Sequence, residues 1–416
     1  MTMAEMRTSS FINGEWVGSS SQIDVLNPAT GKSLASVANA SIADCLRAVD
    51  VAAEAFDAWK NTAPRVRGEI LRKAFEIMMA EQEQLARLIT LEMGKILADS
   101  RAEVAYAAEF FRWFSEEAVR IDGDYRRAPG GANWLMVSRQ PVGVALLATP
   151  WNFPAAMATR KIGPALAAGC TVVLKPAQDT PLTALAIADV LQRAGVPAGV
   201  VNVVVTNPSG PAVAAMMDSG KVRKLSFTGS TKVGSILLAQ AAPRVINCSM
   251  ELGGNAPFLV FGDANIDAAV DGAMLAKMRN GGAACTAANR FYVHNSVLAE
   301  FTDKLTARMS ALVLGDGLDA QTTLGPLVSR AEQESVAAMV NGAVSRGAKV
   351  LCGGKAVTSP AFGFQATVLT DVAPDDEILK DEIFGPVAPI VGCSDEQEMV
   401  RLANDVEYGL VSYVFT

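Results

Sequence analysis

"PVGVALLATPWNFPAAMATRKIGPALAAGCTVVLKPA", residues 141–177, is the stretch that decides the fold. Its first ten residues are almost wholly apolar and predict a buried strand, and "CTVVLKP" at 170–176 predicts a second one. Between them a helix begins at Pro154, because proline suits the first helical turn, and ends at Gly169, because glycine accepts the left-handed position after a helix. Strand, helix and strand in this order make one βαβ unit.

The same alternation continues toward the C-terminus. It is seen in "TPLTALAIADVLQRAG" (helix, 180–195), "VVNVVV" (strand, 200–205), "RKLSF" (strand, 223–227) and the helix after "TGS" (228–230). Near-continuously apolar strands in repeated βαβα order predict a parallel sheet covered on both faces by helices. A second α/β region begins near Glu251, with the strand "NAPFLVF" and the helix "NIDAAVDGAMLAKMRN".

Three further regions have other patterns. Residues 41–119 have the helical period and predict a helical layer, whereas "DGDYRRAPGGANWLMVSRQ", residues 122–140, is rich in turn residues and predicts a projecting hairpin. The chain ends on "EYGLVSYVFT", which alternates like a strand and has no polar tail. Because domains seldom stop inside a strand, we expect the C-terminal part of the fold to be absent.

Composition excludes several classes of protein. A chain of 416 residues is long enough for two or three domains, and its net charge of −7 without a basic block argues against nucleic acid or an anionic membrane as partner. Without a signal peptide or a membrane span, it is expected to be soluble and cytoplasmic. Its six cysteines are scattered singly, which predicts reduced thiols and neither a zinc site, another metal site nor a disulfide framework.

Four segments are candidates for a functional site. "TPWNFP" (149–154) and "FTGSTKVG" (227–234) each lie between a strand and a helix, where free N–H groups suit a phosphate. "MELGGNAP" (250–257) has a carboxylate beside two glycines, and "NGGAACTAANR" (280–290) has a thiol among small residues. Each has an ordinary alternative: a rigid turn, a common βα turn, a surface carboxylate and an inert core cysteine.

Together these segments resemble the aldehyde dehydrogenase superfamily. The resemblance runs in order through "FINGEW", "NPATGK", "PWNFP", "KPA", "FTGS", "ELGGN", the cysteine segment and "DEIFGPV", and so covers essentially the whole chain. It implies an α/β, aldehyde dehydrogenase-like fold. A Rossmann-like NAD(P)-binding domain is expected over 1–119 and 141–250, a small oligomerisation hairpin over 120–140, and an α/β catalytic domain over 251–416.

The resemblance implies an enzyme that oxidises an aldehyde with NAD(P)+. In the family a cysteine thiolate attacks the aldehyde, the resulting thiohemiacetal passes a hydride to the nicotinamide, and water hydrolyses the thioester. Cys285 matches this nucleophile, and Glu251 matches the general base, which is needed because the only histidine is His294. Asn152 matches the oxyanion donor. Members that transfer the acyl group to coenzyme A do not rely on this base, so a carboxylic acid is the expected product.

The resemblance also assigns residues to the cofactor. They are Thr149, Trp151, Lys175, Gly229 and Ser230 for the adenosine, phosphate and backbone contacts, with Glu382 and Phe384 for the nicotinamide ribose. Gln178 stands where many NAD-preferring relatives have a glutamate that repels a 2′-phosphate. NADP is therefore expected to be tolerated or preferred over NAD.

Two arginines indicate the substrate. Arg160 and Arg279 lie where the resemblance puts the walls of the substrate tunnel, and both are expected to be desolvated. A buried guanidinium without a partner is costly, and a substrate carboxylate would supply that partner. The same pair occurs in dehydrogenases similar to succinate-semialdehyde dehydrogenase, so a dicarboxylic semialdehyde is the leading substrate. Surface arginines and a neutral aliphatic or hydroxy-aldehyde substrate are the alternatives.

Three departures from the family pattern bear on activity. Ala283 stands where the family usually has Gln or Glu, and Ala287 stands where some relatives carry a second cysteine. Family members also continue past the position of Thr416, and the missing piece would supply the last strands, part of the substrate mouth and the strand that pairs subunits. A non-catalytic cofactor-binding remnant is therefore an alternative function, and a homodimer or tetramer is expected if the C-terminus is complete.

Overall fold

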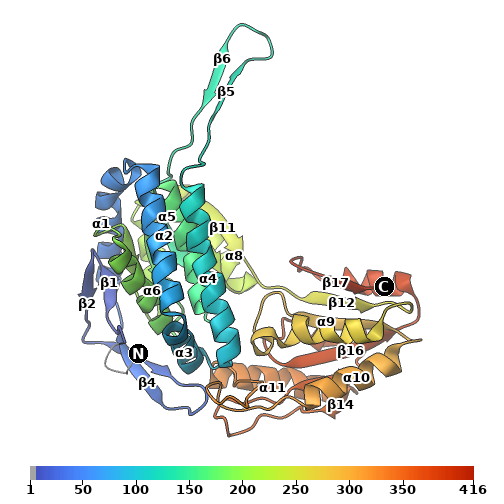
Figure 1. Ribbon diagram of the computed structural model, residues 1–416. Helices are drawn as coiled ribbons and strands as arrows, with labels where there is room; N and C mark the ends of the chain where they lie inside the picture. The colour runs from blue at the N-terminus through green and yellow to red at the C-terminus, as the bar shows by residue number, and fades with distance from the viewer. Residues whose placement is uncertain (1–5) are drawn as a thin grey trace. The chain divides into compact units, whose positions relative to one another are not determined.

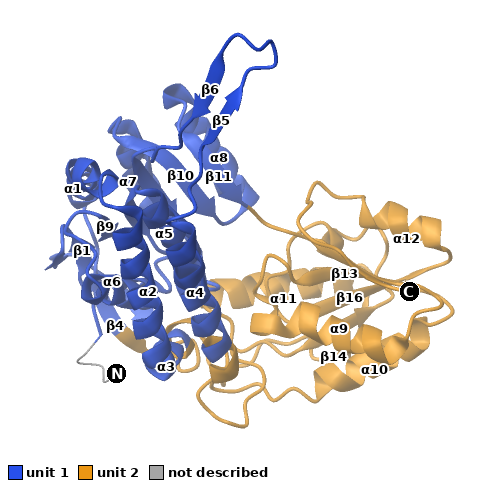
Figure 2. Ribbon diagram, turned by 45° about the horizontal axis from the view of Figure 1, so that its top comes forward, with its two compact units in different colours: residues 1–25, 35–89, 101–251 blue, residues 26–34, 90–100, 252–416 orange. Residues whose placement is uncertain are grey.

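The computed structural model describes residues 6–416, which form two compact units (Figure 2). Unit 1 contains the described residues up to Val25, Ala35–Ile89 and Arg101–Glu251, and unit 2 contains Leu26–Leu34, Thr90–Ser100 and Leu252–Thr416. The family resemblance implied that all of 1–119 belongs to one domain. The structure places Leu26–Leu34 and Thr90–Ser100 with unit 2 instead, which only the packing of these two short segments reveals.

Unit 1 is built on a sheet that has seven strands within the described residues, in the order β11-β10-β7-β8-β9-β1-β2. The strands are β1 (Ser10–Ile12), β2 (Glu15–Val17), β7 (Val144–Ala148), β8 (Thr171–Lys175), β9 (Val201–Val203), β10 (Val222–Thr228) and β11 (Asn247–Glu251). Neighbours from β11 to β9 pair in parallel, and β1 pairs antiparallel with both β9 and β2. Every residue of β7 is buried, so the parallel sheet predicted from residues 141–177 is confirmed.

Helices cover this sheet (Figure 1). They are α1 (Ile42–Lys60), α2 (Pro64–Ala80), α5 (Pro154–Ala168), α6 (Pro181–Ala194), α7 (Ser209–Asp218), α8 (Thr231–Ala241) with the 3-10 turn η2 (Ala242–Arg244), and most of α3 (Gln82–Met93) and α4 (Leu97–Glu117). α5 begins with Pro154 and ends at Gly169, whose φ is +90°, as the sequence predicts. α1 packs against α7, whereas α2, α5 and α6 pack together, so the helices form separate groups.

A hairpin extends from unit 1. Its strands are β5 (Asp124–Arg127) and β6 (Trp134–Val137), which pair antiparallel, and every residue in both is exposed. The rings of Tyr125 and Trp134 stack with centroids 5.1 Å apart. Figure 1 shows the two strands reaching well beyond the helices of their unit. The projecting hairpin expected from the turn-rich segment is therefore present.

Unit 2 contains a second sheet, which has six strands among residues 6–416, in the order β14-β15-β16-β13-β12-β17. The strands are β12 (Ala256–Val260), β13 (Ala288–His294), β14 (Lys349–Cys352), β15 (Thr367–Thr370), β16 (Val387–Cys393) and β17 (Tyr413–Phe415). All neighbours pair in parallel except β14 and β15. A separate two-stranded sheet consists of β3 (Gln22–Leu26) and β4 (Ser33–Ala38).

The helices of unit 2 pack onto its sheet around an aromatic core. They are α9 (Ile266–Met278), α10 (Leu298–Ser310), α11 (Arg330–Ser345) and α12 (Glu396–Ala403), with the 3-10 turns η3 (Arg279–Gly282) and η4 (Glu377–Leu379). Phe258 of β12, Phe291 of β13 and Phe301 of α10 are completely buried together. Among the helices of the described residues, none combines the length and apolar composition needed to cross a bilayer.

Candidate active site

The carboxyl edge of the unit 1 sheet gathers most of the residues assigned to the cofactor. β7 lies between β8 and β10, and Ala148 at its end pairs with Lys175 on one side and Phe227 on the other. After β9 the chain crosses back past β7 to form β10, which makes the boundary between β7 and β10 a topological switch point. Open α/β sheets bind ligands at such points, beyond the carboxyl ends of the strands.

The turn after β7 carries Asn152 on a buried backbone. Asn152 is 5 % exposed, and its Oδ1 accepts a hydrogen bond from the N–H of Phe153 at 3.1 Å. This contact helps to fix the side-chain amide against the turn. The following helix has no N-cap side chain. Buried Glu103 of α4 caps it instead, accepting from the N–H groups of Ala155 and Ala156 at 2.9 and 3.3 Å, which fixes the start of α5.

Lys175 closes β8 beside this turn. The N–H of Thr149 donates to the carbonyl oxygen of Lys175 at 3.2 Å, which ties the ends of β7 and β8 together. Burial lowers the pKa of Lys175, and the negative charge of nearby Asp179 opposes that change. Half-buried Trp151 accepts a hydrogen bond on its carbonyl oxygen, and Gln178 is exposed in the loop after β8. The edge therefore presents one partly desolvated cation.

The turn after β10 packs closely at Gly229. A Cβ at this position would lie 2.5 Å from Cζ of Phe227, so a larger residue would require the Phe227 ring to move. Ser230 caps α8, with its Oγ accepting from the N–H of Val233 at 3.4 Å. The Oγ1 of Thr228 is buried without a hydrogen-bond partner in the part of the chain that the structure describes.

Glu251 lies next to this turn, at the end of the edge strand β11. Its carbonyl oxygen accepts from the N–H of Gly229 at 3.1 Å, and its side chain is exposed. The exposed position of this carboxylate follows from the open end of an edge strand. Buried Lys161 of α5 donates to Ser226 Oγ at 2.8 Å. Burial and the Arg160 charge lower the pKa of Lys161 to about 8, although the Glu251 carboxylate raises it.

In unit 2 the assigned residues lie at the opposite kind of sheet edge. The loop of Cys285 precedes β13, the glycines of "ELGGN" precede β12, and Glu382 and Phe384 precede β16. β12, β13 and β16 are adjacent and parallel. The residues therefore meet beyond the amino ends of three neighbouring strands.

The loop around Cys285 makes close backbone contacts. A Cβ at Gly254 would lie 2.2 Å from the carbonyl oxygen of Cys285, and one at Gly282 would lie 2.2 Å from that of Gly385. The Tyr413 hydroxyl donates to the carbonyl oxygen of Thr286 at 2.7 Å. Cys285 itself is half-buried, and it forms no disulfide with any described cysteine. Glycine at these positions is what allows the neighbouring segments to approach the thiol loop so closely.

Glu382 contacts the same glycine segment. Its Oε1 accepts from the N–H of Gly254 at 3.3 Å, and a Cβ at Gly253 would lie 2.8 Å from Oε2. Burial raises the pKa of Glu382 to about 7, although the Gly254 hydrogen bond and the Lys277 charge oppose it. Half-buried Phe384 follows two residues later. The glycine segment therefore contacts both the Cys285 loop and the carboxyl assigned to the ribose.

Lys277 is buried and donates hydrogen bonds next to Glu382. It is 1 % exposed, and its Nζ donates to Asn289 Oδ1 at 2.9 Å and to the carbonyl oxygen of Ile383 at 3.4 Å. Burial lowers the pKa of Lys277 to about 7, while the negative charge of Glu382 opposes the change.

The two arginines assigned to the substrate are less buried than the sequence argument expected. Arg160 is half-buried, with its guanidinium 5.5 Å from the centre of the Phe110 ring and Nη1 3.9 Å from Met157 Sδ. Arg279 is exposed. It caps the C-terminal end of α9 with a non-helical ψ of 127°, which turns the chain away from the helix and leaves the side chain at the surface. Arg160 is thus only partly desolvated, and the expectation that Arg279 is desolvated does not agree with its exposed position.

The candidate residues are divided between the units. Unit 1 holds Asn152, Glu251, Arg160, Thr149, Trp151, Lys175, Gln178, Gly229 and Ser230, and unit 2 holds Cys285, Arg279, Glu382 and Phe384. No group of three His, Cys, Asp or Glu residues within 6–416 is arranged to hold a metal ion. The structure therefore brings the candidates together as two groups, one at each sheet edge.

Comparison with known proteins identifies the family of this chain. The family model described as "Aldehyde dehydrogenase family" matches residues 16–416. The chain belongs to the aldehyde dehydrogenase family. As a member of this family it is an NAD(P)-dependent enzyme that oxidises aldehydes.

Curated aldehyde dehydrogenases and solved structures resemble it along nearly its whole length. A succinate-semialdehyde dehydrogenase of Paenarthrobacter nicotinovorans is 52 % identical over 383 residues, which are 92 % of this chain and 85 % of that protein. A glutarate-semialdehyde dehydrogenase of Pseudomonas putida is 46 % identical over 411 residues, 98 % and 85 % of the two chains. The crystal structure of an E. coli NADP-dependent enzyme has a TM-score of 0.96 and 47 % identity, and covers 99 % of this chain and 86 % of that one.

Sequence reasoning missed four polar residues that support this aldehyde dehydrogenase's candidate site. They are Asp99, Glu103, Lys161 and Lys277. Lys161 stands next to Arg160 in a largely buried helix, which is a signal that could have been used. Glu103 and Asp99 lie in a segment with the pattern of an ordinary charged helix. Their contacts, that of Glu103 with the start of α5 and that of Asp99 Oδ2 with the N–H of Asn280 at 3.1 Å, become visible only in the structure.

Proposed function

We propose that this aldehyde dehydrogenase oxidises a carboxylated semialdehyde, such as succinate semialdehyde, to the dicarboxylic acid, with NADP+ favoured over NAD+. The observation that carries the proposal is the type of substrate for which its relatives are named. The relatives that are 52 % and 46 % identical are named for succinate and glutarate semialdehyde, and both of these aldehydes carry a carboxylate at the far end.

The chemical step is assigned to three residues. The Cys285 thiolate attacks the aldehyde carbon and forms a C–S bond, and the oxyanion is stabilised by the Asn152 amide and the N–H of Cys285. The buried turn after β7 supports the Asn152 role, since the N–H of Phe153 donates to its Oδ1 at 3.1 Å and so helps to fix the side chain. Glu251 takes a proton from the water that hydrolyses the thioester, which releases the acid and the thiol.

The residues of the carboxyl edge fit a nicotinamide dinucleotide. Buried Thr228 Oγ1 has no partner among the described residues, and it adjoins the start of α8, whose first N–H groups suit a phosphate. Lys175 adds a cation to the same edge. Lys175 and Ser230 would hold the adenosine phosphates, and Glu382 the nicotinamide ribose. When bound, the cofactor accepts the hydride from the substrate carbon.

The preference for NADP rests on one neutral side chain. Gln178 is exposed in the loop after Lys175 and cannot repel a 2′-phosphate as a glutamate would. The E. coli enzyme of similar structure is described as NADP dependent, which supports the same preference.

The substrate carboxylate is assigned to Arg160 and Arg279. A guanidinium binds a carboxylate through two parallel hydrogen bonds, and its affinity does not depend on complete burial of the free arginine. The Phe110 ring orients Arg160 through a cation–π contact. Arg160 is half-buried and Arg279 is exposed, which is compatible with a substrate that enters from solvent.

A panel of aldehydes assayed separately with NAD and NADP tests the proposal. Succinate semialdehyde with NADP is expected to give the highest kcat/KM, and a higher kcat/KM for butanal would contradict the assignment of the substrate. Arg160→Leu should raise KM for the semialdehyde about tenfold or more and leave KM for butanal within about twofold. Arg65→Leu, which changes an exposed arginine of α2, is the matched control and should change neither value.

Self-association is assigned to the hairpin. The side chains of Tyr125, Trp134 and Met136 are 67 %, 61 % and 78 % exposed, and a contiguous exposed apolar patch of this kind marks an interaction surface. A homodimer or tetramer is expected. Light scattering checks it, and Met136→Asp should shift the population toward monomer.

A further inference from the structure

The loop that carries Cys285 turns through three consecutive residues in the left-handed conformation. The φ angles of Asn280, Gly281 and Gly282 are +56°, +60° and +83°. Glycine adopts these angles without a steric penalty, whereas asparagine does so at some energetic cost. Contacts outside the turn must therefore stabilise it at Asn280.

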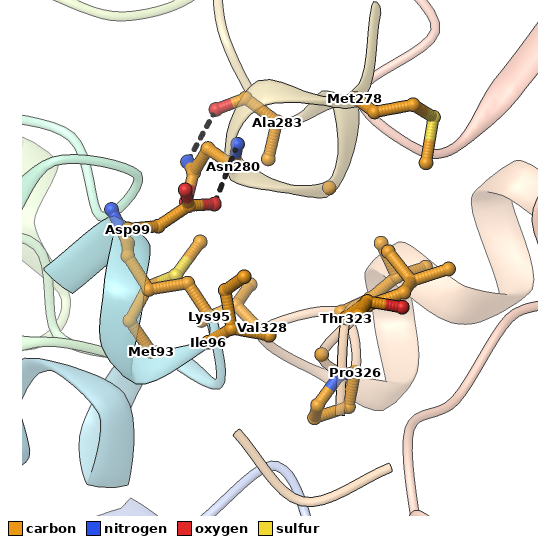
Figure 3. A pocket seen from close by; sticks show the side chains of 14 residues that line it. Met93, Lys95, Ile96, Asp99, Met278, Asn280, Ala283, Thr323, Pro326 and Val328 are labelled. Carbon is orange, nitrogen blue, oxygen red and sulfur yellow. Dashed lines mark hydrogen bonds between the residues drawn. The ribbon is translucent and has the colours of Figure 1, made fainter. Parts of the chain in front are cut away.

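Asp99 makes such a contact (Figure 3). It lies in the first turn of α4, in the part of that helix that belongs to unit 2, and its Oδ2 accepts from the N–H of Asn280 at 3.1 Å. The Asn280 side chain continues the connection, because its Nδ2 donates to the carbonyl oxygen of Ala283 at 2.9 Å. The N–H of Ala283 in turn donates to the carbonyl oxygen of Asn280 at 3.1 Å. Hydrogen bonds thus lead from Asp99 to a residue two positions before Cys285.

The space beside this turn is not filled by side chains. A cavity of about 20 Å³, room for a single water, is lined by residues that include Lys95, Asp99, Asn280 and Ala283 (Figure 3). Ala283 is 2 % exposed and presents only a methyl group. A longer side chain at this position would fill part of the cavity and support the loop by packing. In this chain, support from the Asp99 side comes from hydrogen bonds.

The surroundings of Asp99 suit a carboxylate that accepts from the backbone. Lys95 and Arg279 are the cations close enough to affect it, and both favour its ionised form. Burial raises the pKa of Asp99, and the hydrogen bond from Asn280 opposes that effect.

We propose that Asp99 is a positioning residue for the nucleophile: it holds the turn at Asn280–Ala283 and so keeps the Cys285 thiol where it attacks the aldehyde. The inference rests on the proposed role of Cys285. Asp99 acts through the backbone of the turn, so its loss should lower kcat and leave KM for aldehyde and cofactor unchanged. A displacement of about 1 Å at a reacting group lowers rates on the order of 100-fold.

Two substitutions at position 99 test this. Asp99→Ala is expected to lower kcat about 10- to 100-fold with both KM values within about twofold. Asp99→Asn keeps an oxygen acceptor and should restore kcat to within about threefold of wild type. Asp395→Ala is the matched control, since Asp395 also accepts from a backbone N–H of unit 2, that of Glu398 at 2.9 Å, at the start of α12. It should leave kcat unchanged.

Asn280→Gly tests the same turn if Asp99→Ala does not fold. Glycine accepts the left-handed φ, so this variant keeps the backbone conformation of the turn while it loses the bond from Nδ2 to Ala283, and a lower kcat with unchanged KM is expected. The double variant that combines Asp99→Ala with Asn280→Gly should have a kcat only slightly lower than that of either single variant, because both substitutions act through one turn. Wild-type kcat in Asp99→Ala, or equal losses in the Ala and Asn variants, would overturn the proposal. Full turnover in Cys285→Ala would instead overturn the proposed function, so the two failures are distinguishable.

Discussion

The two units of this chain use opposite ends of their parallel strands. In unit 1 the candidate residues follow β7, β8, β10 and β11, beyond their carboxyl ends, where helices begin. In unit 2 they precede β12, β13 and β16, beyond the amino ends, where backbone segments lie against one another at glycines. The first edge offers helix N-termini and a lysine, which suit phosphates, and the second offers a thiol held by its backbone.

The difference shows that a largely parallel sheet can carry functional residues at either end of its strands, for different physical reasons. A carboxyl edge binds because the strand-to-helix turns leave N–H groups for an anion. At the amino edge of unit 2 the thiol loop lies against neighbouring segments at glycines, so its geometry depends on close backbone packing. We therefore expect substitutions at the carboxyl edge to act through single side chains, and those at the amino edge to act through steric displacement of the loop.

The largest expected effect is a fall of kcat on substitution of Asn152 at the carboxyl edge of unit 1. Asn152→Ala removes an amide NH₂ group without changing the buried backbone of its turn, and kcat should fall about 100- to 1,000-fold. Steady-state kinetics with succinate semialdehyde measures it. Asn404→Ala, at the exposed end of α12, is the control and should keep wild-type kcat. A loss under about threefold in Asn152→Ala would remove the oxyanion role.

The next effect tests the amino edge. Gly254→Ala puts a Cβ within 2.2 Å of the carbonyl oxygen of Cys285, so the loop must move and kcat should fall on the order of 100-fold. Cofactor affinity at unit 1 should change less than about threefold. A Cβ at Gly409 of the same unit meets nothing within 4 Å, and Gly409→Ala should behave as wild type. Equal kinetics in both variants would show that backbone packing at Gly254 does not position the thiol.

The smallest effect concerns the pH dependence of stability at the amino edge. The pKa of Glu382 is about 7 in the fold against an ordinary 4.5, so folding favours the protonated carboxyl. Its contribution is fully present below pH 4.5 and is lost as the pH rises through 7. Lys277, whose pKa is also about 7, loses its contribution as the pH falls through 7 from the alkaline side, so the window from 4.5 to 7 reports mainly on Glu382.

Thermal unfolding between pH 4.5 and 7 measures this effect. The Tm of Glu382→Gln should fall less steeply with rising pH than that of wild type, because glutamine does not titrate. Glu377→Gln, an exposed carboxylate paired with Lys380, is the control and should follow the wild-type slope. Identical slopes in wild type and Glu382→Gln would show that the carboxyl is not desolvated in solution.

Much of the fold was predictable from residues alone. The βαβ unit, the start of α5 at Pro154 and its end at Gly169 follow from apolar runs, proline and glycine, and the structure has them. The hairpin followed from its turn-rich composition. The carboxyl edge was also predictable, because the rule for open α/β sheets needs only the order of strands and helices.

The amino edge was not predictable in this way. The interpretation of Cys285 and Glu382 depended on the resemblance to a family, since no general rule places ligands at amino ends. The exposure of Arg279 and Glu251 depends on packing between distant segments, which periodicity does not contain. The contact of Asp99 with Asn280 joins residues 181 positions apart and could not be read from either segment.

Trapping the acyl-enzyme tests the central claim most directly, because it involves a residue from each edge. Glu251→Gln protein mixed with NADP and succinate semialdehyde should form the thioester but hydrolyse it slowly, since the base is gone. Peptide mass spectrometry is expected to find near-stoichiometric acyl adduct on the peptide that contains Cys285. An adduct on another of the six cysteines, or wild-type turnover of Glu251→Gln, would contradict the account.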